Sequence, residues 1–428
     1  MRHRTTLSPL HVDRSVPALV VKVGQYSWHH GGVGAIRSLG RLGIPVYAVT
    51  EDRWTPAAVS RYLTDRFVWR TTGLEDPTWL IAELLDIGRR IGRPTVLVPT
   101  DDEIAVLIAE HAADLRGAFL IPDIEPMLPR RLASKRGLYE LCSEHGVPTP
   151  WAAFPTNPDE LDRIAAQASF PLVVKNLEAF ERHRARAVAG TTVIRNAAEL
   201  RALARGWGEE FSVVLQDYLP TGDAEDWIVN AYCDASATCL VQFTGVKVRS
   251  LPPHAGMTSS ACSLPNPTLV EMTAHLVKRV GYRGAVDLDW RYDPRDGRYK
   301  LLDFNPRVGA QFRLFETDEG IDVVRALHMD LTGCDVPPSN QVDGRRLVVE
   351  NFDVPAMLAY RVRGYATPPE AAQAGNVELA WLARDDLKPF FVMLARFIPQ
   401  ALGGLVALWR ARRRRTGKKE IPWAASSE

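Results

Sequence analysis

Four residues near the middle of the chain carry side chains suited to an oxygen-ligand metal site and a phosphate contact. They lie in residues 284–312, where two short apolar runs flank a turn-rich loop, a pattern that predicts a β-hairpin. Asp287 lies on the first expected strand. Asp303 and Asn305 lie on the second, two residues apart, so their side chains leave the same face. Arg307 follows, and a guanidinium there can hold a phosphate in a bidentate fork.

The converging oxygens favour a hard divalent cation. Mg²⁺ takes a few carboxylate or amide oxygens and completes its shell with water and substrate phosphates, and Mn²⁺ is an alternative occupant. Leu301, Leu302 and Phe304 are apolar, which places the acids at the end of a buried strand, where a carboxylate needs a cation. Asp289 points to the same face as Asp287 and is an alternative ligand. The competing interpretation is a surface hairpin with solvated acids.

Length and composition bound the class of protein. At 428 residues the chain is too long for one ordinary core, so two or three domains are expected. A net charge of +1 does not by itself indicate a nucleic-acid partner, and none is expected. The five cysteines are scattered without a CxxC pair, which indicates a reducing cytosol without a disulfide framework or structural zinc. Residues 1–17 are polar and basic, lack the apolar stretch of a signal peptide and are expected to be disordered.

The first part of the chain alternates between apolar strands and helical patterns. Residues 18–23, 46–49 and 95–98 are typical of strands in a parallel sheet, and the alternation predicts a doubly wound α/β domain. Residues 31–34 read GGVG, between the first strand and a helix. This spacing differs from the GxGxxG of dinucleotide sites. The glycines are therefore expected to permit close backbone approach, either to packing neighbours or to a substrate.

Two lysines stand where a helix or a strand would present them to an anion. Lys135 follows the expected N-cap Ser134 and opens a helix that ends at Gly146. Lys175 ends the apolar strand 170–175, where a buried charge needs a partner. For Lys135 the alternative is a solvated lysine at a helix start.

The order of these motifs resembles the ATP-grasp superfamily, with a similarity that covers roughly residues 18–332. In that family an acid on one strand and an acid-x-Asn-Pro-Arg sequence on the next hold magnesium around ATP. The matching residues here are Asp287, Asp303, Asn305 and Arg307. The usual second acid is Glu, whereas this chain has the shorter Asp303.

The resemblance also implies an ATP site. Lys135 and Lys175 match the two lysines that contact the nucleotide, and residues 213–222 resemble the hinge strand whose backbone hydrogen-bonds adenine. The hinge residues are Gln216, Asp217, Tyr218 and Leu219. The interval 178–189 covers the phosphates in the family. Here it is basic rather than rich in glycine, so arginines at 182–186 either contact phosphate or form a solvated charge run.

Further charged residues complete the expected site. Asp223, Glu225 and Asp226 are candidates for the ribose hydroxyls, and Glu225 is preferred because family members often have an acid at about this distance. Lys247 and Arg249 share one face of an expected strand just before a Pro-Pro turn, which favours an anion site for triphosphate or a substrate carboxylate. With the hairpin arginine they are the expected catalytic cations.

The C-terminal segment combines an apolar helix with a basic cluster. Residues 348–355 look strand-like, and residues 390–409 are strongly apolar with a polar-to-small stripe. Residues 410–419 carry seven Lys or Arg and no acid. This pattern is typical of an amphipathic helix on an anionic leaflet, so peripheral contact through 390–419 with the inner face of the membrane is expected. Alternatives are a helix docked on the protein and a transmembrane span, which a central charge and proline disfavour.

The expected organisation is a doubly wound parallel-sheet domain followed by an ATP-grasp fold of two α+β lobes that clasp ATP. The expected boundaries are 1–17 for the N-terminal segment, 18–130 for the Rossmann-like domain, 131–335 for the ATP-grasp domain (131–220 and 221–335 for its nucleotide and metal/substrate lobes), 336–385 for an extension, and 386–428 for the helix and basic tail.

The motifs together predict an ATP-dependent ligase that joins a carboxylate to an amine or thiol. A carboxylate is a poor electrophile, so its oxygen first attacks the γ-phosphate to give an acyl phosphate, which the amine then attacks. The chain resembles ligases of the D-aspartate ligase type, which suggests a small carboxylate and an amino acid, peptide or cell-wall precursor as substrates. An ATP-binding scaffold without turnover is the alternative. A third hypothesis, an NAD-dependent enzyme, is disfavoured by the missing GxGxxG. Oligomeric state stays open, with a dimer as one option.

Overall fold

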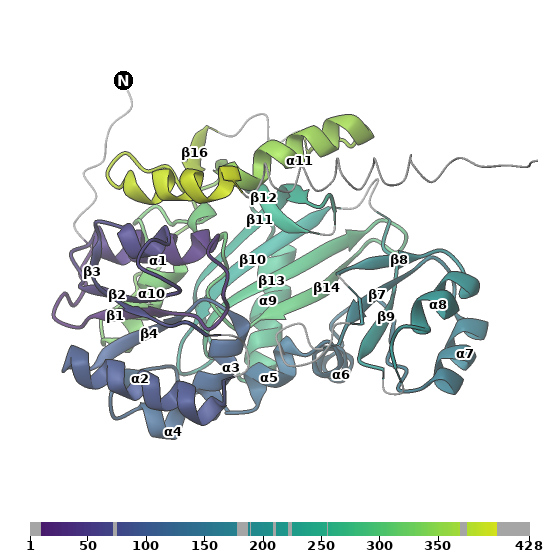
Figure 1. Ribbon diagram of the computed structural model, residues 1–428, viewed down its shortest axis with the longest axis horizontal. Helices are drawn as coiled ribbons and strands as arrows, with labels where there is room; N and C mark the ends of the chain where they lie inside the picture. Colours follow the sequence, from purple (N-terminus) through teal and green to yellow (C-terminus); the bar gives the residue numbers. More distant parts are fainter. Residues whose placement is uncertain are drawn as a thin grey trace, which may run out of the picture.

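A parallel five-stranded sheet forms the first part of the structure (Figure 1). The computed structural model of the chain describes residues 10–71, 75–177, 187–188, 190–208, 211–220, 225–254, 256–368 and 375–399. The strand order is β3-β2-β1-β4-β5, with β1 (Ala18–Val21), β2 (Val46–Thr50), β3 (Leu63–Val68), β4 (Thr95–Pro99) and β5 (Phe119–Leu120). One face is covered by α1 (His30–Gly40), and the other by α2 (Pro77–Ile91), α3 (Asp102–Glu110) and α4 (Ala112–Leu115). Because both faces are covered, β1 is apolar along its whole length.

A smaller antiparallel sheet forms the next lobe, in the order β6-β9-β7-β8. Its strands are β6 (Ala152–Ala153), β7 (Leu172–Asn176), β8 (Thr192–Ile194) and β9 (Val213–Asp217), and α7 (Pro158–Gln167) and α8 (Ala197–Ala204) pack on it. Helices α5 (Leu128–Ala133) and α6 (Lys135–His145) lead into this lobe. The predicted ends of α6 are confirmed, because Ser134 caps it through Gly137 N and Gly146 adopts a left-handed conformation at φ 68°.

The central sheet has seven strands in the order β14-β13-β10-β11-β12-β15-β16. Its strands are β10 (Asp226–Cys233), β11 (Cys239–Leu251), β12 (Met257–Ser263), β13 (Gly284–Asp293), β14 (Arg298–Asn305), β15 (Arg345–Val348) and β16 (Asn376–Leu379). Its helices are α9 (Pro267–Val280), α10 (Val323–Leu331) and α11 (Glu350–Arg363), and short 3₁₀ turns span Ala57–Val59 and Phe312–Leu314. The predicted class, a doubly wound parallel sheet followed by two α+β lobes, is confirmed.

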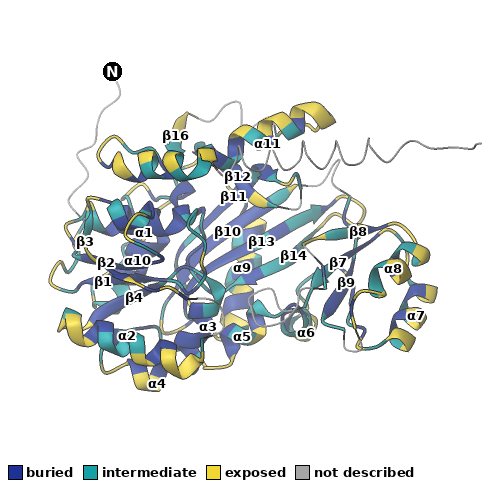
Figure 2. Ribbon diagram, in the orientation of Figure 1, coloured by how far each residue is buried: buried dark blue, intermediate teal, exposed yellow. Residues whose placement is uncertain are grey.

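One apolar core joins the parallel sheet to the central sheet. It contains side chains of β1, α1 and β4 together with Tyr232 of β10, Phe243 of β11 and residues of α10. The rings of Phe243 and Phe315 stack with centroids 5.6 Å apart. Figure 2 shows the strands of both sheets as largely buried, with exposed residues on the outer helices. The two sheets therefore share one packed interior, which fixes their relative position.

Two glycines of the GGVG segment make this close packing possible. A Cβ at Gly31 would lie 2.7 Å from Ala310 Cα, and a Cβ at Gly34 would lie 2.8 Å from Arg313 Cγ. Both distances are shorter than a real Cβ contact. Of the two roles left open by the sequence, the glycines therefore serve packing neighbours, by letting α1 approach the segment after the hairpin.

The C-terminal part of the chain is integrated into the fold. Strands β15 and β16 extend the central sheet, and residues 350–363 form α11. The prediction of a strand over 348–355 is therefore wrong for most of its length. Residues 388–399 are helical, and Met393 is fully buried in the shared core. Asp386 lies just before this helix and forms a buried ion pair with Arg37 of α1 (3.0 Å), so this segment is docked on the first sheet.

Several expectations fall on residues outside the described ranges. These are residues 1–9 of the N-terminal segment, the arginines at 182–186, Asp223, and residues 400–428 with the basic cluster. Among the described residues, no helix combines the length and apolar character needed to cross a bilayer. The domain boundaries stay predictions.

Candidate active site

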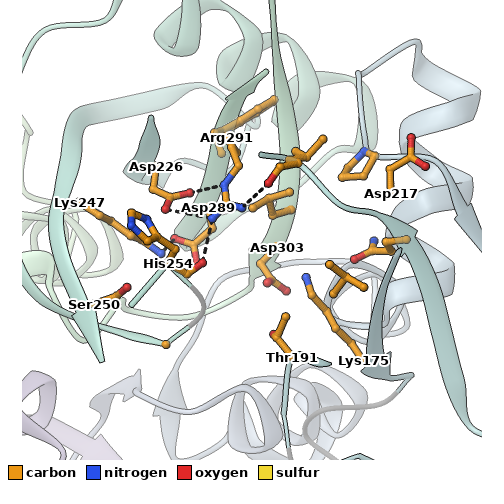
Figure 3. A pocket seen from close by; sticks show the side chains of 17 residues that line it. Lys175, Thr191, Asp217, Asp226, Lys247, Ser250, His254, Asp289, Arg291 and Asp303 are labelled. Carbon is orange, nitrogen blue, oxygen red and sulfur yellow. Dashed lines mark hydrogen bonds and ion pairs between the residues drawn. The ribbon is translucent and has the colours of Figure 1, made fainter. Parts of the chain in front are cut away.

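Two adjoining cavities lie between the sheets. The smaller cavity has a volume of about 190 Å³ and the larger one about 600 Å³. We call the residues that line both of them the junction, namely Lys175, Thr191, Lys247, Gly256, Asp289 and Asp303. The junction thus combines cations and acids from the smaller lobe and the central sheet (Figure 3).

The hairpin β13–β14 places two carboxylates opposite each other. In its register Asp289 pairs with Asp303, and Asp287 pairs with Asn305. Like charges on directly opposite residues repel, so they need nearby cations. Lys135 forms an ion pair with Asp303, and the Lys247 Nζ lies 2.8 Å from Asp289 Oδ1. The acids at the junction are therefore balanced by lysines from α6 and β11.

Asp287 is already engaged by neighbouring side chains. Its Oδ1 accepts hydrogen bonds from Asn230 Nδ2 and Gln311 Nε2, both at 2.9 Å, and its Oδ2 accepts one from Arg307 at 2.9 Å. Asn305 Nδ2 donates a hydrogen bond to the backbone carbonyl of Asp287. Burial raises the pKa of Asp287 to about 6, with Arg307 acting in the opposite direction.

Of the two acids on β13, Asp289 is better placed than Asp287 to contact a cation. Its Oδ1 is buried and lies 2.8 Å from Lys247 Nζ, whereas the carboxylate of Asp287 accepts hydrogen bonds from three side chains. It also lines both cavities and faces Asp303 directly. The geometry therefore favours Asp289, the alternative ligand, with Asp303 and Asn305, over the set that contains Asp287.

Lys175 is a half-buried lysine at the junction. Figure 3 shows the side chains of Lys175 and Asp303 pointing toward one another. Burial lowers the pKa of Lys175 to about 7, and the nearby Lys135 and Arg291 act in the same direction. For Lys247 burial also lowers the pKa, but Asp289 and Asp226 outweigh it and the pKa is raised. The junction is therefore ready to accept further negative charge near Lys175.

The smaller cavity contains part of the predicted hinge. Gln216, Asp217 and Leu219 line it, together with Val173 and Leu302. Apolar side chains that enclose a narrow space are suited to a flat base. The predicted hinge residues Gln216, Asp217 and Leu219 are thus brought together at one end of this cavity.

Three expected site residues lie elsewhere. Tyr218 and Glu225 are not among the described residues that line either cavity, and Glu225 accepts a hydrogen bond from Trp227 Nε1 (2.8 Å). Asp226, the neighbouring candidate, does line the smaller cavity, and its carboxylate pairs with Arg291 (2.6 Å). The third residue is Arg249.

Arg249 does not share an anion site with Lys247, so that prediction is corrected. Its Nε and Nη2 donate to Asp353 of α11 at 2.8 and 2.7 Å, and it lines neither cavity. The physical reason is a register irregularity between Lys247 and Arg249, which interrupts the two-residue alternation of β11.

Arg307 links the hairpin to the first sheet. Besides Asp287, it contacts Asp102 at the start of α3, with 3.1 Å between Nε and Oδ1. Asp102, Asn230 and Gln311 also surround these groups, although no sequence motif marks them as site residues. The position of Asp102 in the sequence could have indicated a site residue, because it follows β4 at the carboxyl edge of a parallel sheet, where ligands commonly bind. The other two are recognisable only from the three-dimensional contacts.

Comparisons with solved structures define the fold. N5-carboxyaminoimidazole synthetase of Staphylococcus aureus, complexed with ADP, superposes with a TM-score of 0.57 at 11% identity, covering 78% of this chain and 81% of that chain. L-amino acid ligase of Bacillus licheniformis gives 0.54 at 15% identity, covering 74% and 75%. Biotin carboxylase of Campylobacter jejuni gives 0.55 at 13% identity, covering 75% and 72%. The chain therefore has the ATP-grasp fold, as its resemblance implied.

The chain is also similar in sequence to a curated protein. The chain is 26% identical to D-aspartate ligase of Enterococcus faecium over 247 residues, which are 55% of this chain and 58% of that enzyme. The match thus spans little more than half the length of this curated relative. No family model matches the chain.

The low pKa of Lys175 predicts that ATP binding depends on pH. The protonated lysine attracts triphosphate, so binding favours that form, and affinity is expected to fall above pH 7 by up to about tenfold per pH unit. Calorimetric titration with ATP between pH 6 and pH 8.5 measures this. Lys175→Met, which cannot titrate, is expected to bind more weakly at pH 6 and to lose this part of the pH dependence. An unchanged pH profile in the variant would contradict the assignment.

Proposed function

We propose that the chain is an ATP-dependent ligase that joins a carboxylate to an amine through an acyl phosphate, with release of ADP and phosphate. The observation that carries the proposal is the junction, where facing acids and lysines stand between a narrow cavity at the hinge and a larger second cavity. This order matches what the reaction needs. The adenine base of ATP would lie in the smaller cavity, its phosphates at the junction, and the second substrate in the larger cavity.

The residues at the junction fit a magnesium ion. Asp289, Asp303 and Asn305 provide carboxylate and amide oxygens, and the two facing carboxylates concentrate negative charge that a divalent cation would help to neutralise. In the described part of the chain no three His, Cys, Asp or Glu side chains cluster to hold a metal alone. The remaining ligands would thus come from Asn305, water and phosphate. Such an ion supplies positive charge to phosphate oxygens, and Mn²⁺ suits the same ligands.

The lysines are assigned to the triphosphate. Lys135, Lys175 and Lys247 surround the junction and balance its charge, while Gln216 and Leu219 hold the base in the smaller cavity. Arg307 lines the larger cavity, where it is placed to stabilise the oxyanion that develops on the acyl carbon. In this scheme a substrate carboxylate oxygen attacks the γ-phosphorus as ADP leaves. The amine then attacks the acyl carbon and phosphate leaves.

The similarity to D-aspartate ligase and the fold of L-amino acid ligase support a substrate of the amino-acid or peptide class, including a cell-wall precursor. The alternative is an ATP-binding scaffold without turnover. The shorter Asp303 in place of Glu favours it. The two functions differ in whether ADP release requires both an acid and an amine.

Release of ADP from Mg·ATP in the presence of pooled amino acids and small carboxylates tests the proposal. Release is expected to need an acid and an amine together and to vanish in Lys175→Ala. Asp289→Ala and Asp303→Ala are expected to lower kcat by about 100-fold or more, because each removes one of the two facing carboxylates that we propose as metal ligands. Asp296→Ala, at the exposed tip of the same hairpin, is the matched control and should keep full activity. Full activity in both junction variants would overturn the site.

We also propose peripheral contact with an anionic membrane, which would place the protein at the inner face of the membrane. Val354, Met357, Leu358 and Val362 form an exposed apolar stripe along α11, with Val362 77% exposed. Phe391 and Ile398 are exposed on the helix 388–399, whose opposite side is docked. Exposed apolar stripes suit a lipid surface, and the sequence also carries a basic cluster at residues 410–419, which lie outside the described part of the structure.

Sedimentation with lipid vesicles tests the membrane contact. Binding is expected to phosphatidylcholine vesicles that contain phosphatidylserine and to be at least tenfold weaker without it. The double variant Leu358→Glu/Val362→Glu should lose binding to the anionic vesicles, because charges would replace the apolar stripe. Val193→Glu, an exposed apolar residue on β8, is the control. Equal binding of the stripe variant and the wild type would contradict the proposal.

A further inference from the structure

Outside the junction, the larger cavity is lined in part by rings and a thioether. Tyr26, Trp28 and His30 come from the loop after β1 and the start of α1, Met257 comes from β12, and Phe352 comes from α11. We call these five residues the aromatic wall. The wall draws on three separate parts of the chain that the fold brings together.

Contacts behind the aromatic wall hold it in place. The Tyr26 hydroxyl lies 3.5 Å from Met257 Sδ, which joins the first sheet's loop to the central sheet. Trp28 packs edge-on against Phe397 at 5.8 Å between centroids, and His30 packs against Trp381 at 6.2 Å. Phe352 packs against the shared core. A surface held in this way is ready to receive an apolar group without much rearrangement.

The charges near the aromatic wall are already matched to protein partners. Of the described residues that line the larger cavity but not the smaller one, Lys135 and Arg307 are the cations. Lys135 forms an ion pair with Asp303, and Arg307 contacts both Asp102 and Asp287. Asp101 accepts hydrogen bonds from the backbone N–H groups of Val23 and Gly24 through Oδ2 and from Ile104 through Oδ1.

The two histidines that line the larger cavity, His29 and His30, are expected to be neutral. The His29 Nδ1 accepts the Gly32 N–H at 3.0 Å and thereby caps α1, so this nitrogen carries no proton. Burial lowers the pKa of His30 to about 4, so its imidazole is neutral at physiological pH. A further substrate carboxylate in the larger cavity would compete with protein carboxylates for Arg307 or Lys135, or would be desolvated without a cation.

We infer that the aromatic wall binds an aromatic or aliphatic side chain of the second substrate, and that the substrate is not an acidic amino acid. This inference rests on the proposed function, which makes the larger cavity the place of the acid or amine. It sets this chain apart from the D-aspartate ligase to which it is similar, since an aspartate would bring a second carboxylate to the wall. The apolar side chain would leave its own carboxylate and amine free to lie toward the junction.

The experiment compares phenylalanine and leucine, as both enantiomers, with aspartate and glutamate. Two measurements are made with each: ADP release from Mg·ATP with pooled partner substrates, and calorimetric binding in the presence of Mg·ADP. The apolar amino acids are expected to give at least tenfold higher kcat/KM and tenfold tighter binding. Phe352→Ala and Trp28→Ala should each raise KM for the apolar amino acid about tenfold, with KM for ATP unchanged. Trp54→Ala, which removes an exposed ring that lines neither cavity, is the matched control.

A gain of function guards against variants that merely fold poorly. Met257 is 50% exposed, so Met257→Lys is expected to be tolerated and to place a cation at the wall. It should move the preference toward aspartate and glutamate by about tenfold. Tighter binding of acidic amino acids to the wild type, or no binding of the apolar ones, would overturn the inference. Turnover with acidic amino acids would leave the ligase function standing and overturn only the wall. Binding of apolar amino acids without ADP release would support the aromatic wall and overturn the ligase function.

Discussion

The structure is organised around two carboxylates that face each other across one pair of strands. Asp289 and Asp303 lie opposite in the register of β13 and β14, an arrangement that is unfavourable unless positive charge is near. Lys135 and Lys247 supply part of that charge from other elements. In the proposed function, a metal–triphosphate complex would meet both the remaining demand for cations at the acids and the demand for anions at Lys175. The junction would then be an incomplete charge network that a nucleotide completes.

The rest of the fold keeps this network between two differently shaped spaces. The smaller lobe contributes Lys175 and the hinge, and the central sheet contributes the acids. The first sheet closes the larger cavity, because α1 approaches the segment after the hairpin so closely that Gly31 has no room for a Cβ. Arg307 spans the same boundary through Asp102 and Asp287. A change in how the first sheet packs would thus alter the larger cavity before it altered the smaller one.

Much of the fold could be predicted from local patterns, and the errors have physical causes. The hairpin and helix α6 were predictable, because alternation and capping residues act locally. Sequence could not choose between Asp287 and Asp289, because both leave the same face, and the distant Asn230 and Gln311 occupy the first. Arg249 was misplaced because a register irregularity is not visible in the alternation. Helix α11 was missed because Pro355 is uncommon inside a helix.

Calorimetric titration of ATP with and without Mg²⁺ tests the central claim about the facing carboxylates most directly. The wild type should bind ATP much more weakly when Mg²⁺ is removed, because Asp289 and Asp303 then repel the phosphates. In the double variant Asp289→Asn/Asp303→Asn the repulsion is gone. Its affinity for metal-free ATP should equal or exceed that of the wild type, and Mg²⁺ should no longer improve it. An undiminished effect of Mg²⁺ in the double variant would show that these carboxylates do not hold the metal, and the account of the junction would be wrong.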